Sequence, residues 1–392
     1  MKENLTNRIF SLILVIMAVS CSHDDFSGRN QWDGLSVRKT IRIDGNIKEF
    51  ETGNHLIDSV SYVILEYLDD YPVGEINTLL FMDDYIVVAD QRAADAVYLF
   101  DYNGKFRRQI SSQGTGPGEY VNLTYVTLSA DKREIVIQDR ARGNMMWFDI
   151  NGRLTRTKVI PSYSGNIEFL SENTWITDIY PCNKNVTRRG HNPFFIVTDS
   201  AWNYRYALNY SRKFREPYRV VPRPVVKTYE GTVNGSIPDD RRIYCFTEDS
   251  VYVRYRFLID RESDEYDWDR LYNEYHTPES DDFVRLLHPI LECPGYVSFS
   301  VRNAEGTTRL VYHKQEGKVY RFETYSHDDF IYNFLDRTIF CRDNILISSV
   351  GASNFYSAAP LISREASPII HEIAGKVNAE SNPVLIFYHL KQ

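Results

Sequence analysis

The sequence lacks the short patterns that mark common metal and hydrolase sites. Its five cysteines form no Cys-x-x-Cys pair, and its nine histidines include no i, i+4 pair of the kind that binds zinc on a helix. No Gly-x-Ser-x-Gly nucleophile elbow is present. We therefore assign no catalytic residue and expect no metal ligand and no cofactor, although a metal site assembled from distant positions stays open.

A strongly basic surface is also missing. The formal net charge is −8, and acidic and basic residues are mixed along the chain. Because nucleic-acid binding requires a basic patch, we expect no nucleic-acid partner. The 53 acidic residues make chance pairs of carboxylates unavoidable, so acidity alone does not indicate a glycosidase.

Long hydrophobic runs are scarce. The apolar run Ile9–Val19 follows Lys2 and Arg8 and is shorter than the roughly 20 residues that span a bilayer, which predicts a signal peptide. Ala18-Val19-Ser20-Cys21 resembles the lipobox of bacterial lipoproteins, which implies cleavage before Cys21 and acylation of its thiol. An ordinary secretory peptide is the alternative. No later stretch is long and apolar enough to cross a membrane, so the lipid would be the only membrane anchor.

The residues after Cys21 favour a cell-surface location. Ser22–Asp25 resembles the acidic tag that directs some Gram-negative lipoproteins to the outer face of the outer membrane, and a solvated tether is the alternative. The expected organisation is a signal peptide at 1–20, a lipidated flexible tether at 21–37 and a single folded domain at 38–392. The expected location is the outer membrane, with exposure at the cell surface.

The four remaining cysteines are widely spaced. Cys182, Cys245, Cys293 and Cys341 would lie outside the cytosol, where a disulfide can form. Three of them lie in or beside apolar strand-like runs, where cysteine acts as a small core residue. We expect mostly free, buried thiols.

A hairpin pattern recurs along the chain and is the main evidence for the fold. Val97–Asp101 precedes Asn103-Gly104, and Met145–Asp149 precedes Asn151-Gly152, with Asp101 and Asp149 48 residues apart. Asn-Gly is a strong hairpin signal because both residues tolerate the positive φ of a type I′ turn. A repeat of this length is typical of propeller blades.

Further hairpins complete most of the blades. Three weaker outer hairpins begin at Phe195, Ile243 and Leu310. An inner hairpin is expected within Tyr218–Glu230, where two prolines argue for an irregular strand. The other inner hairpins are Leu79–Phe81 with Ile86–Val88, Val126–Leu128 with Ile135–Ile137, Glu168–Leu170 with Trp175–Thr177, Ile290–Glu292 with Val297–Val301, and Ile339–Cys341 with Ile345–Ile347.

These units predict an all-β, six-bladed β-propeller in which N- and C-terminal strands close one blade. The final strand Val384–Leu390 is expected to pair with Lys39–Ile43, which removes exposed sheet edges. Short helical insertions are expected at Pro368–Val377 and at Trp268–Tyr275.

One loop carries a family resemblance. Gln113–Tyr120, read with Gly74-Glu75-Ile76 before it and Asn382–Ile386 at the end of the chain, resembles six-bladed, NHL-like propeller lipoproteins of uncharacterised function from Gram-negative bacteria. The resemblance covers roughly residues 38–392. It implies the six-bladed fold and the lipid anchor, and it brings no catalytic residues.

Two segments are candidates for binding. The loop ending in Glu119 and Tyr120 connects two blades, so these two side chains are candidate binding residues, although turn chemistry alone explains its glycines. Arg254–Asp282 interrupts the repeat and is expected to protrude as a surface insertion.

The sequence leaves two classes of function open. The first hypothesis is a binding module for a glycan, a peptide or a partner protein. The alternative is a propeller hydrolase or lyase with a metal or paired carboxylates at the channel mouth. Asp58-Ser59-Val60, Asp199-Ser200-Ala201 and Asp249-Ser250-Val251 also resemble tripeptides that are O-glycosylated on exported proteins of some Gram-negative anaerobes.

Overall fold

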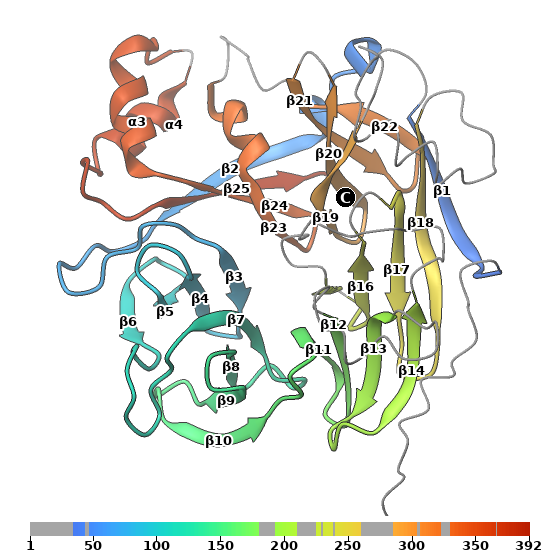
Figure 1. The fold of residues 1–392 in the computed structure, drawn as a ribbon. Helices are drawn as coiled ribbons and strands as arrows, with labels where there is room; N and C mark the ends of the chain where they lie inside the picture. Colours follow the sequence, from blue (N-terminus) through green and yellow to red (C-terminus); the bar gives the residue numbers. More distant parts are fainter. Residues whose placement is uncertain are drawn as a thin grey trace, which may run out of the picture.

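The protein is a ring of six β-sheets, shown in Figure 1. The computed structural model describes residues 34–43, 47–179, 193–209, 225–228, 230–237, 240–259, 285–303, 306–322, 330–365 and 367–392. The strands nearest the axis contact one another around the ring: β3 contacts β7 and β23, β11 contacts β7 and β15, and β19 contacts β23. The predicted six-bladed β-propeller is therefore confirmed.

Each blade is a four-stranded antiparallel meander, numbered here from the innermost strand outward. Blade 1 holds β3 (Thr78–Phe81), β4 (Tyr85–Asp90), β5 (Ala96–Asp101) and β6 (Phe106–Gln109). Blade 2 holds β7 (Leu123–Leu128), β8 (Ile135–Asp139), β9 (Asn144–Phe148) and β10 (Leu154–Val159). Blade 3 holds β11 (Ser164–Ser171), β12 (Thr174–Ile179), β13 (Pro193–Asp199) and β14 (Tyr204–Asn209).

The other three blades follow the same order, and blade 4 carries a fifth strand at its outer edge. Blade 4 holds β15 (Val225–Lys227), β16 (Val233–Ser236), β17 (Arg242–Phe246), β18 (Val251–Ile259) and, outermost, β1 (Val37–Ile43). Blade 5 holds β19 (Arg285–Glu292), β20 (Tyr296–Asn303), β21 (Gly306–His313) and β22 (Lys318–Arg321). Blade 6 holds β23 (Thr338–Arg342), β24 (Ile345–Val350), β25 (Val384–Leu390) and β2 (Ile57–Ile64).

The core lies between neighbouring blades. Val87 and Ala89 of blade 1 pack in one cluster with Val126 and Ile137 of blade 2, and all four side chains are fully buried. Because both faces of a blade are covered in this way, middle strands such as β5 are nearly continuous apolar runs. The outermost strands face solvent and are more polar.

The strand that closes the ring differs from the prediction. β25 pairs with Ile57–Ile64, in a register that joins Ile57 to Leu390 and Ile64 to Val384. Lys39–Ile43, which was expected in this place, instead belongs to β1 and pairs in parallel with β18 of blade 4. The principle of closure by the two ends of the chain holds, but the choice of N-terminal strand was wrong. Both segments have strand-like patterns, and pattern alone does not specify the partner sheet.

The Asn-Gly hairpins form, but with a different turn from the one expected. Gly104 and Gly152 have φ of +81° and +71°, whereas neither preceding asparagine has positive φ. The turn is therefore of the type I kind followed by a left-handed glycine, with a bulge in the ladder between β5 and β6. The type I′ geometry occurs instead at Asp343-Asn344, where both φ angles are positive.

The weakly patterned segments of blade 4 are partly as predicted. β15 lies within Tyr218–Glu230, but its partner β16 begins only at Val233. The expected surface insertion at Arg254–Asp282 is wrong for its first six residues, since β18 extends to Ile259 and most of that end is buried in blade 4. The remainder of that segment, including the helix expected at Trp268–Tyr275, lies outside the described residues.

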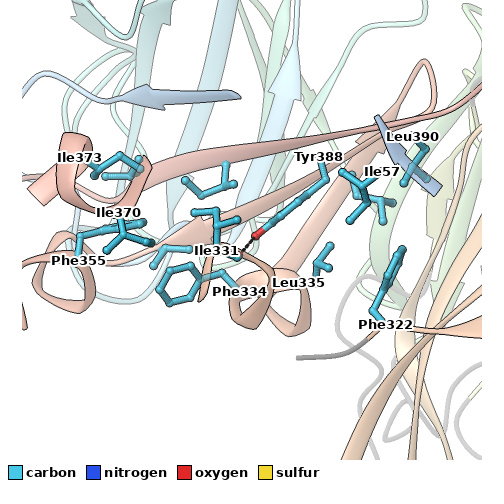
Figure 2. Close-up of a cluster of buried hydrophobic side chains, with 14 of the residues drawn as sticks. Ile57, Phe322, Ile331, Phe334, Leu335, Phe355, Ile370, Ile373, Tyr388 and Leu390 are labelled. Atoms are coloured by element: carbon cyan, nitrogen blue, oxygen red, sulfur yellow. Dashed lines mark hydrogen bonds between the residues drawn. The ribbon is translucent and has the colours of Figure 1, made fainter. Parts of the chain in front are cut away.

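Short helices cover one edge of blade 6, as Figure 1 shows. The predicted insertion is confirmed as α4 (Pro368–Ala374), while α3 (Ala352–Ala358) and the 3-10 helices were not predicted. Phe355, Ile370 and Ile373 from the two helices meet Ile331 and Phe334 in one cluster, drawn in Figure 2. The 3-10 helices are η1 (Ile47–Glu49), η2 (Asn54–Leu56), η3 (Phe330–Arg337) and η4 (Ala359–Leu361).

The thiols that the structure describes are free. Cys245 and Cys293 are buried and Cys341 is half-buried, as expected. Cys21 and Cys182 lie outside the described residues.

Candidate functional site

A cavity of about 410 Å³ lies on the ring axis, and we call it the channel pocket. All six innermost strands contribute to it, through residues such as Leu80, Tyr125, Glu168, Val226, Glu292 and Phe340. A volume in this range is typical of small-molecule sites. The pocket therefore forms only when all six blades are assembled, and no single blade contains it.

The pocket lies at a definite end of the ring. In every blade the innermost strand begins at the connection from the preceding blade and ends at the first turn of its own blade. The next strand is antiparallel to it, so the first turn and the connection lie at opposite ends of the ring. Asp83, Lys132 and Asp343 line the pocket and belong to those first turns. We call this end the turn end and the opposite one the connection end.

A carboxylate and an amine face each other across one wall. Tyr125 and Thr127 donate hydrogen bonds to Glu168 Oε1 at 2.7 and 2.8 Å, and Glu168 is 4% exposed. On the neighbouring strand, burial lowers the pKa of Lys227, and the negative charge of Glu168 partly opposes this effect. Lys227 Nζ donates to Ala130 O at 3.4 Å.

A second carboxylate is enclosed by cations. Glu292 forms ion pairs with Arg254 Nε at 2.7 Å and with Lys314 Nζ at 2.8 Å. Tyr255 donates to its Oε1 at 2.5 Å, and Asn234 donates to its Oε2 at 3.1 Å. Burial alone would raise the pKa of Glu292, but the hydrogen bond from Arg254 and the charge of Lys314 hold that pKa below its ordinary value.

An aromatic wall completes the pocket on the side of blades 6 and 1. The ring centroids of Phe81 and Phe340 are 5.2 Å apart, and Arg342 Cζ lies 5.0 Å above the Phe81 ring. Arg342 also donates to Tyr102 Oη at 3.2 Å and pairs with Asp343 at 3.0 Å. The pocket therefore combines apolar surface, two fixed carboxylates and a partly buried amine.

The two binding residues predicted from sequence have structural roles in their loop. Tyr120 is fully buried and donates to Asp95 O at 2.7 Å. Glu119 accepts a hydrogen bond from Gly116 N at 2.7 Å, and its carboxylate occupies the space that a Cβ at Gly114 would need. The loop lies at the connection end, away from the channel pocket. A binding role for Glu119 and Tyr120 stays a prediction.

The residues of the channel pocket were missed from the sequence, although a signal for them exists. Glu168 stands between Ile167 and Phe169, and Glu292 stands between Leu291 and Cys293, so each carboxylate interrupts an apolar strand. Charged residues are seldom fully buried unless they are paired or functional. A charged residue inside an otherwise apolar innermost strand is the sequence signal that could have located the site.

The described residues contain neither a metal-binding cluster nor a membrane-spanning helix. Within those ranges, no group of three or more His, Cys, Asp or Glu side chains is placed to hold a metal ion. In the same part of the chain, no helix has the length and apolar character needed to span a membrane.

Comparison with known proteins finds a matching family model and solved structures of similar fold. A family model described as a domain of unknown function, DUF4934, matches residues 39–389. A protein of Bacteroides fragilis NCTC 9343 described as exported is 16% identical, with 91% of this chain and 100% of that chain covered and a TM-score of 0.72. A DUF4221 family member from Bacteroides vulgatus ATCC 8482 is 10% identical, with 86% and 97% covered and a TM-score of 0.50. At such identities the likeness shows the fold alone. Comparison with curated proteins finds no match.

Proposed function

We propose that this chain, which belongs to the DUF4934 family, is an exported binding module whose channel pocket holds a small ligand bearing an anionic group. Export and lipid attachment at Cys21 rest on the N-terminal pattern of the sequence, with the tether at 21–37 and an outer-membrane location as part of the same proposal. The described strand β1 begins at Val37, where this tether would end.

Lys227 is the observation that carries the proposed ligand class. A partly buried ammonium group loses much of its hydration, which is costly unless an anion or several hydrogen bonds replace the water. Among the described residues, this amine makes one hydrogen bond, to Ala130 O at 3.4 Å. The nearby Glu168 carboxylate accepts from Tyr125 and Thr127 through Oε1, and its charge offsets part of the cost of burying the amine. An anionic group of a ligand would add a direct partner for the amine.

Two further features describe the rest of the ligand. Asn234 Oδ1 is buried and has no hydrogen-bond partner in the described part of the chain, so a hydroxyl or amine of the ligand could donate to it. Phe81, Phe340 and Ile290 offer apolar surface. We propose a carboxylate or phosphate linked to a partly apolar, hydroxylated body.

The test is binding of defined anions measured by calorimetry. The probes are glucuronate, galacturonate, benzoate and inorganic phosphate, titrated into the wild type, Lys227→Met and a control, Lys105→Met. Lys105 is exposed on a blade 1 turn and does not line the channel pocket. We expect at least one probe to bind the wild type and the control equally, and Lys227→Met to bind it at least tenfold more weakly. Absence of binding by all four anions, or equal binding by Lys227→Met, would falsify the proposal.

Catalysis is the second candidate, because Glu168 and Glu292 both line the pocket. Paired carboxylates are the machinery of glycoside hydrolysis. Here, however, Glu292 is neutralised by Arg254 and Lys314, which suits a structural or binding role better than proton transfer. Turnover of a bound saccharide that is abolished in Glu168→Gln would favour the hydrolase, and metal analysis of the purified protein would test the metal-dependent form.

A further inference from the structure

A second cavity opens beside the channel pocket, and we call it the inter-blade groove. Its volume is about 430 Å³ and it lies between blades 2 and 3. The turns after β7 and β11 form part of its wall, so it opens at the turn end, like the channel pocket. Ser129 lines both cavities, which makes them neighbours on one surface. A ligand longer than the channel pocket could therefore continue into the groove.

The floor of the groove is aromatic. The rings of Trp147 and Trp175 have centroids 6.1 Å apart, and Phe169 packs edge-to-face on Trp175 at 5.4 Å. The indole nitrogen of Trp175 donates to Glu172 O at 3.0 Å. Trp147 is only 2% exposed, and its buried indole nitrogen has no hydrogen-bond partner among the described residues. A buried tryptophan normally finds an acceptor, so this N–H is a donor that the described part of the chain leaves unpaired.

The walls of the groove carry both signs of charge. Arg156 lies 4.7 Å above the Trp147 ring and 3.1 Å from Glu134. Lys158 lies 5.6 Å above the Trp175 ring, and no carboxylate is recorded beside it. Glu172 and Asn173 add acceptors on the facing turn. Hydroxyl groups both donate and accept, so a neutral polyhydroxyl ligand matches this mixture, whereas a strongly charged ligand would meet like charges.

We infer that the inter-blade groove binds the neutral sugar units of an oligosaccharide whose acidic terminal unit occupies the channel pocket. This inference rests on the proposed function, because Lys227 supplies the site for the acidic unit. A peptide is less well matched, since side chains from turns form much of the groove and a peptide strand requires open main-chain groups along an edge.

The experiment uses a ladder of acidic saccharides of increasing length. Glucuronate, aldobiouronic acid and aldotetraouronic acid are titrated into the full mature chain, with calorimetry and tryptophan fluorescence as readouts. We expect the tetramer to bind at least tenfold more tightly than glucuronate. Among the described residues, the lining of the channel pocket includes no tryptophan, whereas Trp147 and Trp175 line the groove, so only the longer ligands should change the fluorescence.

Variants separate the two cavities. Lys158→Met and Glu172→Gln should each weaken binding of the tetramer at least fivefold and leave glucuronate binding unchanged, whereas Lys227→Met should weaken both. Arg92→Met is the matched control, because Arg92 is exposed at the connection end and lines neither cavity. Circular dichroism and urea unfolding of each variant detect a folding defect independently of ligand binding.

Several outcomes would overturn the inference. Equal affinity along the ladder, or equal losses for glucuronate and the tetramer in the groove variants, would exclude the groove while leaving the channel proposal intact. Binding of neutral xylotetraose with a fluorescence change, but no binding of the four anions, would support the groove and reject the channel proposal. Tighter binding of tetraglycine than of any saccharide would assign the groove to a peptide, and absence of binding by every saccharide would reject the saccharide class.

Discussion

At the scale of single residues, two glycines in equivalent turns have different surroundings. Gly104 and Gly152 each follow an asparagine and each has positive φ. A Cβ at Gly104 would lie 2.1 Å from Ile64 O and 2.8 Å from Val63 Cγ1, because this turn packs against the closing strand β2. At Gly152 the nearest atom, Gln109 O, would be 3.6 Å away. Gly104 therefore allows a close approach between blades in addition to a left-handed turn.

The matched pair Gly104→Ala and Gly152→Ala isolates this approach. Both changes force alanine into the left-handed region, at a cost of about 1–2 kcal/mol. Gly104→Ala also drives a methyl group into backbone, so we expect it to lower the free energy of unfolding by at least about 2 kcal/mol more than Gly152→Ala. Urea unfolding of both variants measures the difference. Equal losses would show that the turn moves freely against β2.

The ionisation of Glu292 makes the stability of the fold depend on pH. Its pKa is below the ordinary value of 4.5 in the folded protein, because the contacts with Arg254 and Lys314 outweigh burial. The ionised network stabilises the fold at pH values above the unfolded-state pKa. The stabilisation is lost as the pH falls through the lower pKa of the folded state.

Glu292→Gln should therefore cost most near neutral pH. We expect a loss of about 3 kcal/mol in the free energy of unfolding at pH 7, because Lys314 loses its carboxylate partner and Arg254 keeps only Glu230, and a smaller loss near pH 3. Glu49→Gln, at an exposed position of η1, is the control and should stay within about 0.5 kcal/mol at both values. A difference between wild type and Glu292→Gln that does not change with pH would contradict the assignment.

At the scale of elements, the strand β1 is an addition that the repeat does not require. It extends blade 4 to five strands and pairs in parallel with β18, whereas neighbouring strands within each blade are antiparallel. Ile41 and Ile43 are each 1% exposed and pack with Phe257 and Ile259 between blades 4 and 5. This burial, and the ladder itself, fix the N-terminal segment to the outside of the ring.

Ile41→Ala tests how firmly β1 is held. Removing a fully buried isoleucine should lower the free energy of unfolding by about 2–4 kcal/mol. Arg38→Ala is the control on the same strand, since Arg38 is exposed and only lies over the Tyr252 ring, and it should cost no more than about 1 kcal/mol. Chemical denaturation gives both values. A negligible effect of Ile41→Ala would mean that β1 detaches before the ring unfolds.

The elements also show which parts of the fold the sequence specifies. Hairpins are local, and the turn residues after Asp101 and Asp149 located two of them correctly because the turn chemistry acts within a few residues. The closing strand joins β2 to β25 across more than 300 residues, so its partner depends on the assembled ring. The sequence pattern identified Lys39–Ile43 as a strand near the N-terminal end and assigned it as the closing strand, whereas Ile57–Ile64 occupies that place.

At the scale of the whole molecule, the channel pocket follows from ring closure. Its lining extends from Leu80 in blade 1 to Asp343 in blade 6, so no local motif contains it. The number of blades and the general location of a site on the axis were predictable from the repeat. The residues were not, because the inward-facing positions of each innermost strand are known only once the register is known. Glu168 and Lys227 are neighbours across blades and distant in sequence.

The direction of β1 has a consequence for an anchored molecule. Val37 pairs with Val253 near the start of β18, so the chain enters the ring at the turn end, where both cavities open. If Cys21 carries a lipid, the 13 residues from Cys21 to Asp33 reach at most about 45 Å. An anchored chain would then hold the turn end of the ring, with both openings, no farther from the bilayer than this reach allows.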